Sequence, residues 1–298
     1  MKRKLLSLTL LAAGLMGPVS VLTAAPEVAP DPVRAAAPST PDPASEIRHL
    51  AQLFRAGDLA ALAQAMTPRS QWEAARSAFD RQRSKPTSET DRAHFAENLR
   101  RLTAPDAVDQ LMEKLEPELV KARQQLPAML LMGFGAIQFA VNSSETQLTD
   151  AQRDALRSAL PGIQRWAGTT DFLSAASMRR TLTLLTDAAR RTGITDIDQL
   201  KALPLEGALD RARPMLAAAK EAVRAYGLDL DAVADSLRVD VLERGQDTAR
   251  VRTTVTLFGA PVWAEHELVL VEGHWYGKHA QMDFEDDLAV DAMGELEG

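Results

Sequence analysis

Histidines and acidic residues gather near the C-terminal end of the chain, in the order Glu265, His266, Glu267, Glu272, His274 and His279. In a chain without cysteine, imidazole and carboxylate groups are the available zinc ligands and the usual proton carriers of acid–base catalysis. A zinc site needs three or four ligands that converge. Side chains alternate between the two faces of a strand, so His266 and His279 could share one face while His274 lies on the other. We therefore expect no metal site in this hairpin.

His266 is the strongest single candidate because it interrupts an apolar strand face, which it shares with Val262, Ala264, Leu268 and Leu270. One interpretation makes His266 a polar group in a cavity, where it holds or protonates a ligand. The other makes it a structural histidine near the end of a sheet, hydrogen-bonded to a helix or to solvent. Both interpretations stay open. So does a small acid–base enzyme in which an Asp or Glu assists His266.

Other catalytic signatures are missing from the sequence. It contains no G-x-S-x-G turn for a nucleophilic serine, no glycine-rich phosphate loop and no H-E-x-x-H zinc motif. It contains no cysteine, which excludes thiol nucleophiles, disulfides and thiolate metal sites. We therefore expect a protein that is not an enzyme, with no catalytic residue, no metal and no cofactor.

The spacing of apolar residues changes near Leu237. Over 45–236 apolar residues recur at helical spacing, whereas from Leu237 onward apolar and polar residues alternate with the two-residue period of a half-buried strand. The expected strands cover 237–241, 250–257, 262–271 and 274–279, with turns at 244–247, 259–261 and 272–273. Short connections of this kind predict a four-stranded antiparallel meander over 237–280. The expected fold is α+β, a mostly helical body followed by a C-terminal four-stranded antiparallel meander.

The most apolar run after the N-terminal segment is Pro127–Val141, PAMLLMGFGAIQFAV. As a helix it would be apolar almost all round, which predicts burial on every side. It is shorter than the roughly 17 to 25 residues of a bilayer span, so we expect a core helix and no membrane span here. Pro117 and Pro127 should kink or break the helix that leads into it.

The C-terminal strands carry a resemblance to a known family. The segment from Ser236 to Lys278 contains Asp-Thr-Ala-x-Val at 247–251 and Leu-Val-x-Gly-x-Trp at 270–275. It resembles the C-terminal sheet of nuclear-transport-factor-2-like (cystatin-like) domains, and FRAGDLAALAQAM at 54–66 looks like their opening helix. The resemblance implies a curved sheet that wraps a cone-shaped cavity against helices. Members of that superfamily include enzymes, carriers and structural modules, so the fold would not define the function.

The N-terminal residues predict export. Three basic residues precede a largely apolar run and small residues near Ala24, the pattern of a secretory signal peptide over 1–24. An uncleaved anchor helix is the alternative. A Pro- and Ala-rich linker is expected over 25–44, and an acidic tail over 281–298. The formal charge of −7 argues against nucleic acid and against an anionic membrane as a partner.

These observations predict a periplasmic or secreted, non-catalytic binding or accessory protein. Residues 45–280 would form one body, and an apolar pocket would lie between its sheet and its helices. The expected partner is a small apolar ligand or another protein, and a periplasmic carrier of lipids is the alternative. The residues predicted to line this pocket are His266, Trp263, Trp275, Tyr276, Met132 and Phe134.

Overall fold

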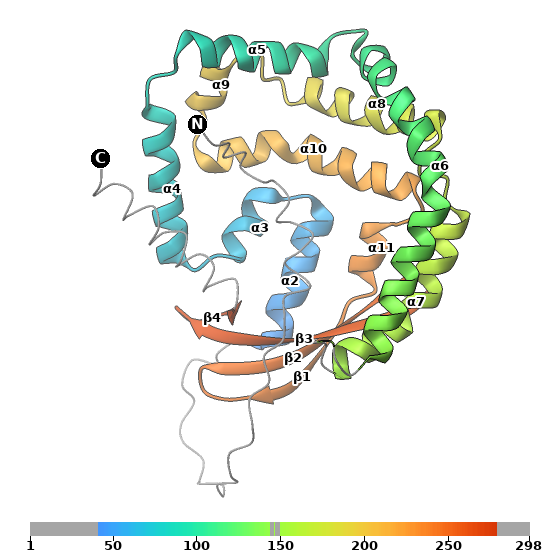
Figure 1. Cartoon of the computed structure of the whole chain (residues 1–298). Helices are drawn as coiled ribbons and strands as arrows, with labels where there is room; N and C mark the ends of the chain where they lie inside the picture. Colours follow the sequence, from blue (N-terminus) through green and yellow to red (C-terminus); the bar gives the residue numbers. More distant parts are fainter. Residues whose placement is uncertain (1–40, 144–145, 147–149, 279–298) are drawn as a thin grey trace, which may run out of the picture. The chain divides into compact units, whose positions relative to one another are not determined.

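The computed structural model describes residues 41–143, 146 and 150–278. It shows an α+β protein in which helices precede a C-terminal antiparallel sheet, as predicted (Figure 1). The helices are α2 Pro43–Ala56, α3 Leu59–Ala65, α4 Arg69–Ser84, α5 Glu89–Thr103, α6 Ala107–Asn142, α7 Asp150–Thr169, α8 Ala175–Arg191, α9 Ile197–Ala202, α10 Leu205–Ala225 and α11 Leu230–Asp235. The strands are β1 Arg238–Arg244, β2 Thr248–Leu257, β3 Ala260–Val271 and β4 His274–Gly277.

The chain divides into two compact units. A helical unit consists of His49–Leu237 and Thr254–Val262. A sheet unit contains Arg238–Thr253 and, within the described residues, 263–278 and 41–48. The division passes through α2, β2 and β3. The sequence predicted one body over 45–280 with a linker up to 44. The structure begins α2 at Pro43, and Pro43 and Ala44 are buried.

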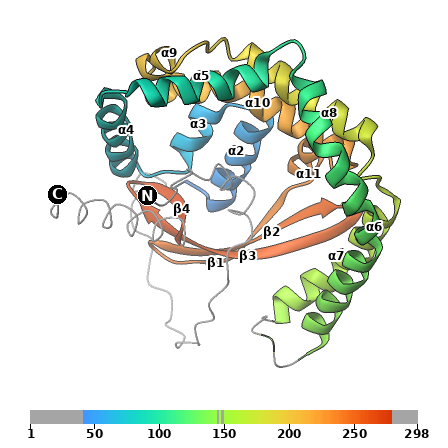
Figure 2. The ribbon, with the colours of Figure 1, turned by 45° about the horizontal axis from the view of Figure 1, so that its top comes forward.

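In the helical unit, the most extensive contact between two described helices is that of α8 with α10, both labelled in Figure 2. Helix α8 also contacts α5 and α6, and α10 contacts α3, α4 and α11. Small residues on the facing surfaces, Ala188 on α8 and Ala218 and Ala222 on α10, are buried. Small side chains allow two helices to approach closely, which explains why this pair forms the centre of the unit.

A buried lysine ties three helices of this unit together. Lys220 of α10 is only 7% exposed, and its Nζ donates to the carbonyl oxygens of Phe54 and Arg55, both at 3.1 Å. It also pairs with Asp231 at the start of α11 and lies 4.7 Å from the centre of the Phe54 ring. Unpaired carbonyls at the end of a helix attract positive charge, so Lys220 caps the C-terminus of α2.

Helix α6 differs from the prediction in one respect. It runs from Ala107 to Asn142 with Pro117 and Pro127 inside it, so of the two predicted outcomes, a kink or a break, the break does not occur. A proline removes one backbone hydrogen bond and presses on the preceding turn, but it does not force a helix to end. Helix α6 packs against α7 and α8, and these contacts help to stabilise it.

The sheet unit is a meander with strand order β1-β2-β3-β4. Its core contains Val251 of β2, Leu268 of β3 and Trp275 of β4, all at most 6% exposed. Ile47 of α2 packs against this core. The Trp275 Nε1–H donates to the carbonyl of Pro41 at 2.7 Å, which joins the beginning of the described chain to its end.

Two hairpin turns connect the last three strands. Glu272 and Gly273 both have positive φ and form the predicted tight turn. The turn between β2 and β3 uses Phe258 and Gly259, with φ of 52° and 79°, one residue earlier than predicted. Phe258 stacks on Trp166 of α7 with 4.6 Å between ring centres, and Trp166 also meets Phe172 edge to face. A bulky residue at positive φ is strained, and we attribute its tolerance to this aromatic packing.

Candidate functional site

His266 lies on the core face of β3, as the alternation of the strand predicted. Its Nε2 is 2.9 Å from the Oγ1 of Thr253, a residue of β2 that is 7% exposed. Burial lowers the pKa of His266 from its ordinary value of 6.5, so the ring is neutral at pH 7. A neutral imidazole bonded to a threonine hydroxyl supports the structural interpretation of this histidine, because a general base normally faces a substrate or a carboxylate.

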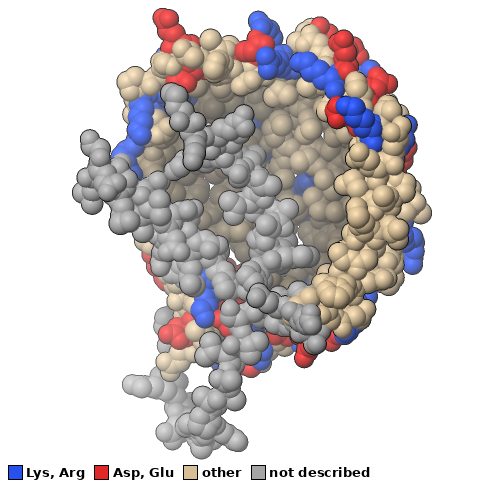
Figure 3. Space-filling model, viewed as in Figure 1, with Lys and Arg blue, Asp and Glu red and all other residues tan. Residues whose placement is uncertain are grey.

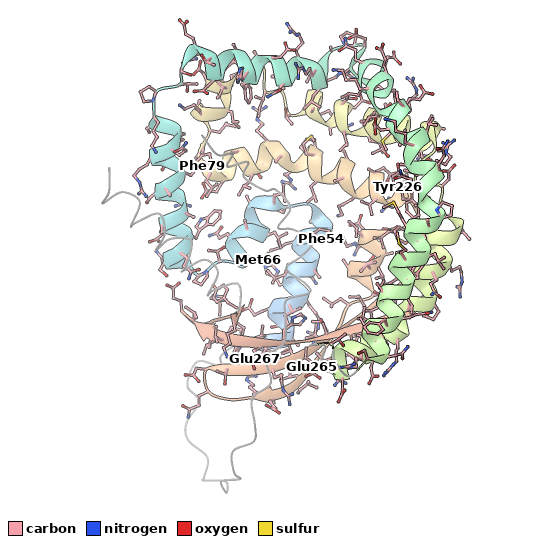
Figure 4. The ribbon with its side chains drawn as sticks, in the orientation of Figure 1. Phe54, Met66, Phe79, Tyr226, Glu265 and Glu267 are labelled. Carbon is pink, nitrogen blue, oxygen red and sulfur yellow. The ribbon has the colours of Figure 1, made fainter. Side chains whose placement is uncertain are left out.

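The other face of the sheet carries a row of alternating charges. Glu265 of β3 accepts hydrogen bonds from Arg252 at 2.7 Å and from Arg250 at 3.3 Å, and Arg250 also pairs with Glu243 of β1. The Arg252 guanidinium lies 4.4 Å from the centre of the Trp263 ring. Glu265 and the next residue of the row, Glu267, are labelled in Figure 4. Opposite charges on neighbouring strands stabilise the pairing, so these groups serve the sheet.

The structure separates the four sheet residues that were predicted to line a pocket. The pairing of Leu270 with Trp275 and of Val269 with Tyr276 shows that the two aromatic residues point to opposite faces. By the same alternation, His266 is on the face of Trp275 and Trp263 is on the other. Trp275 is buried in the core. Burial and the nearby carboxylates of Glu272 and Glu46 raise the pKa of Tyr276.

The histidines do not come together as ligands in the described residues. His274 Nδ1 lies 2.9 Å from Glu46 Oε1 of α2, so this histidine joins α2 to β4. His279 lies outside the described residues. Within the described part of the chain, no group of three or more His, Asp or Glu residues could hold a metal ion.

The most unusual surface of the helical unit is the outer face of α6. Four large apolar side chains of this helix are 58 to 76% exposed, namely Met129, Leu131, Met132 and Phe139. Gly133, Gly135 and Ala136 lie between them and Ala128 directly precedes them, and these four small residues are exposed as well. An added Cβ at Gly133 or at Gly135 would meet no atom within 4 Å. We call residues 128–139 on this side the α6 face. In Figure 3 this part of α6 is an uncharged area.

The exposure of the α6 face corrects the prediction that Pro127–Val141 is buried on every side. The opposite side of the helix is the inner one, where Met112, Leu119 and Val141 are buried. Phe134 is half-buried on that inner side, whereas Met132 is 67% exposed. The predicted pocket between sheet and helices stays a prediction.

By length and composition, α6 is apolar enough to cross a membrane, and only 6% of its most apolar 18-residue window is buried. A core helix would be largely buried. The uncharged sequence nevertheless covers only part of α6, since Glu113, Lys114, Glu116, Glu118, Lys121 and Arg123 occupy its first half.

Charged residues near the ends of the α6 face are already engaged. The Arg123 Nη2 donates to the carbonyl of Leu173 at 2.7 Å, and the Arg157 Nη2 donates to the carbonyl of Val141 at 3.2 Å. Both arginines thereby fasten α6 to neighbouring parts of the helical unit. They do not form a free basic rim of the kind that attracts anionic lipid.

Sequence reasoning identified the apolar run but missed its exposed face. A helix with apolar residues on all sides has no polar stripe to mark which side meets the protein. The only strongly polar residue of the run, Gln138, lies on the exposed side and was the one available signal.

Comparison with protein-family models, with curated proteins and with solved structures found no match to this chain.

Proposed function

We propose that this chain is an exported, non-catalytic binding or accessory protein, and that it binds an apolar helix of a protein partner through the α6 face. The observation that carries the proposal is the exposure of Met129, Leu131, Met132 and Phe139 along one side of a helix whose other side is packed. Exposed apolar patches of this kind usually mark interaction surfaces, because leaving them in water costs free energy.

A protein partner suits this face better than a bilayer does. The run Pro127–Val141 is about 22 Å long at 1.5 Å per residue, below the roughly 30 Å of a hydrocarbon core. The inner side of α6 is covered by α7 and α8, so α6 would have to leave the helical unit to span a membrane. Small residues between large ones also offer hollows to the ridges of another helix.

A photo-reactive amino acid at position 132, in the full chain expressed in its own cells, tests this proposal. We expect cross-linking to a polypeptide, seen as a protease-sensitive increase in mass. Leu131→Glu in the same chain should abolish it without lowering the melting temperature. The matched control places the photo-reactive group at Arg81, on the exposed side of α4, where no cross-link is expected.

Two results would overturn the proposal. One is the absence of any adduct specific to position 132. The other is an adduct to lipid, which would favour the lipid carrier.

Mass spectrometry of an organic extract of the purified protein gives an independent check, since a carrier should retain phospholipid in near-stoichiometric amount. Cell fractionation tests export, and recovery of the chain in the cytoplasmic fraction would contradict that part.

A further inference from the structure

The geometry points to a second copy of this chain as the occupant of the α6 face, packed antiparallel with Gly135 of each copy at the crossing point. This inference rests on the proposed function, because it names the partner of the same surface. It rests further on the order of large and small residues along α6, on their charge and on the area that they expose.

The α6 face is arranged symmetrically about Gly135. Leu131 and Phe139 each lie four residues, or about one helical turn, from it in opposite directions. In an antiparallel pair that crosses at Gly135, Leu131 of one copy meets Phe139 of the other, and the reverse contact forms by symmetry. Such an isologous contact is the usual geometry of homodimers, and one patch on each copy suffices to close it.

Small residues supply the space that this packing needs. Gly135 has no neighbour within 4 Å of where its Cβ would be, and Ala128 lies on the same exposed side. Large side chains flank both, with Leu131 on one side and Met132 and Phe139 on the other. The small residues form a groove and the large side chains beside them form ridges. The ridges of one helix can pack into the groove of an identical helix.

The absence of charged residues from the α6 face favours an apolar partner surface over a charged one. No Asp, Glu, Lys or Arg occurs between Arg123 and Glu145. Two copies therefore meet along α6 without burying a charge, which would otherwise oppose association. The chain is acidic overall, at −7, so the attraction must come from apolar contact.

The exposed area is sufficient for a specific but reversible contact. Leu131, Met132 and Phe139, which lie on the side of Gly135, present on the order of 300 to 400 Å² per copy. A pair would bury roughly 700 to 800 Å², which is in the range of weak, reversible contacts. We therefore infer a dimer that dissociates on dilution.

The absence of cysteine from the chain permits a direct test of the geometry. The full chain with Gly135→Cys should form a disulfide-linked dimer under mild oxidation, because the two positions face each other at the crossing. Ala128→Cys is the matched control. It is also exposed, but in an antiparallel pair it lies far from its own counterpart, beyond the roughly 7 Å that a disulfide allows between Cα atoms. Equal cross-linking of both variants would indicate a parallel or random contact and overturn the inference.

Sedimentation equilibrium of the unmodified chain tests the association itself. We expect a monomer–dimer equilibrium that Leu131→Glu shifts toward monomer by at least tenfold in dissociation constant. Val120→Glu, an equally charged change on an exposed residue outside the α6 face, should leave the equilibrium within twofold. A chain that stays monomeric at every attainable concentration would overturn the inference. The proposed function would survive that result if position 132 still cross-linked to a different polypeptide, and it would fail separately if no polypeptide were captured.

Discussion

Phe258, at the turn between β2 and β3, lies directly against Gly162 of α7. A Cβ added to Gly162 would be 3.0 Å from both the Cβ and the carbonyl oxygen of Phe258. The neighbouring Ser158 hydroxyl donates to the carbonyl of Pro261 at 2.6 Å. The hairpin turn is thus held by aromatic stacking on one side and by backbone contact on the other.

Gly162→Ala should therefore lower the free energy of unfolding. The gain in helix propensity, about 1 kcal/mol, is outweighed by overpacking against a backbone carbonyl, so we expect a net loss of about 1 kcal/mol. Gly168→Ala is the control on the same helix, because nothing lies within 4 Å of its added Cβ, and it should leave stability unchanged or raise it. Chemical denaturation measures both, and equal effects would show that Phe258 does not rest on Gly162.

Replacing Lys220 with methionine tests the cap on α2. The variant removes the buried ammonium group from the carbonyls of Phe54 and Arg55 and from Asp231, which keeps its pair with Arg224, and we expect a loss of about 2 to 4 kcal/mol. Lys121→Met, at an exposed residue of α6, should change stability by less than about 0.5 kcal/mol. If the two variants unfold at the same denaturant concentration, the buried contacts of Lys220 contribute nothing measurable.

His266 should make the protein less stable in acid. Its pKa is lowered by burial, so the unfolded chain binds a proton more readily than the folded one. The free energy of unfolding should decrease as the pH falls below the ordinary histidine value of 6.5, and this contribution should level off below the lowered pKa.

Thermal melting of His266→Gln between pH 8 and pH 5 provides the measurement. The variant should lose part of the dependence on pH, whereas His94→Gln, at an exposed position, should keep it all. A His266→Gln curve parallel to that of the unmodified protein would contradict a neutral, buried imidazole.

The orientation of α6 can be checked with two adjacent residues. Leu119 is 7% exposed and Val120 is 51% exposed. Leu119→Ala should cost about 2 to 4 kcal/mol through loss of buried apolar contact, and Val120→Ala should change stability by about 0.5 kcal/mol or less. A larger effect at Val120 would mean that the helix turns its other side to water.

The fold class followed from periodicity because the two periods are distinct. Residues before Leu237 repeat at helical spacing, and those of β2, from Thr248 to Leu257, alternate. The tight turn at Glu272 and Gly273 was also predictable, since glycine adopts positive φ without strain. The turn between β2 and β3 was predicted one residue too late, because a phenylalanine at positive φ depends on packing against Trp166, a residue distant in sequence.

The candidate site was only partly accessible to sequence reasoning. Alternation placed His266 on the core face correctly, but it could not show that Thr253 would be its hydrogen-bond partner. The run Pro127–Val141 was correctly expected to be helical, and its burial was wrong. Composition determines how apolar a helix is, while the packing of α7 and α8 determines which side of α6 remains uncovered.

Residues Thr254–Val262 form the end of β2, the turn and the start of β3, yet they belong to the helical unit. The helical unit is therefore discontinuous in the chain. A fragment that stops at Leu237 would lack Phe258, and the ring of Trp166 would lose its stacking partner. During synthesis, most helices leave the ribosome before the hairpin that completes their unit. We therefore expect the last helical contacts to form only after translation has passed Val262, which makes C-terminal truncations more damaging than the order of the elements suggests.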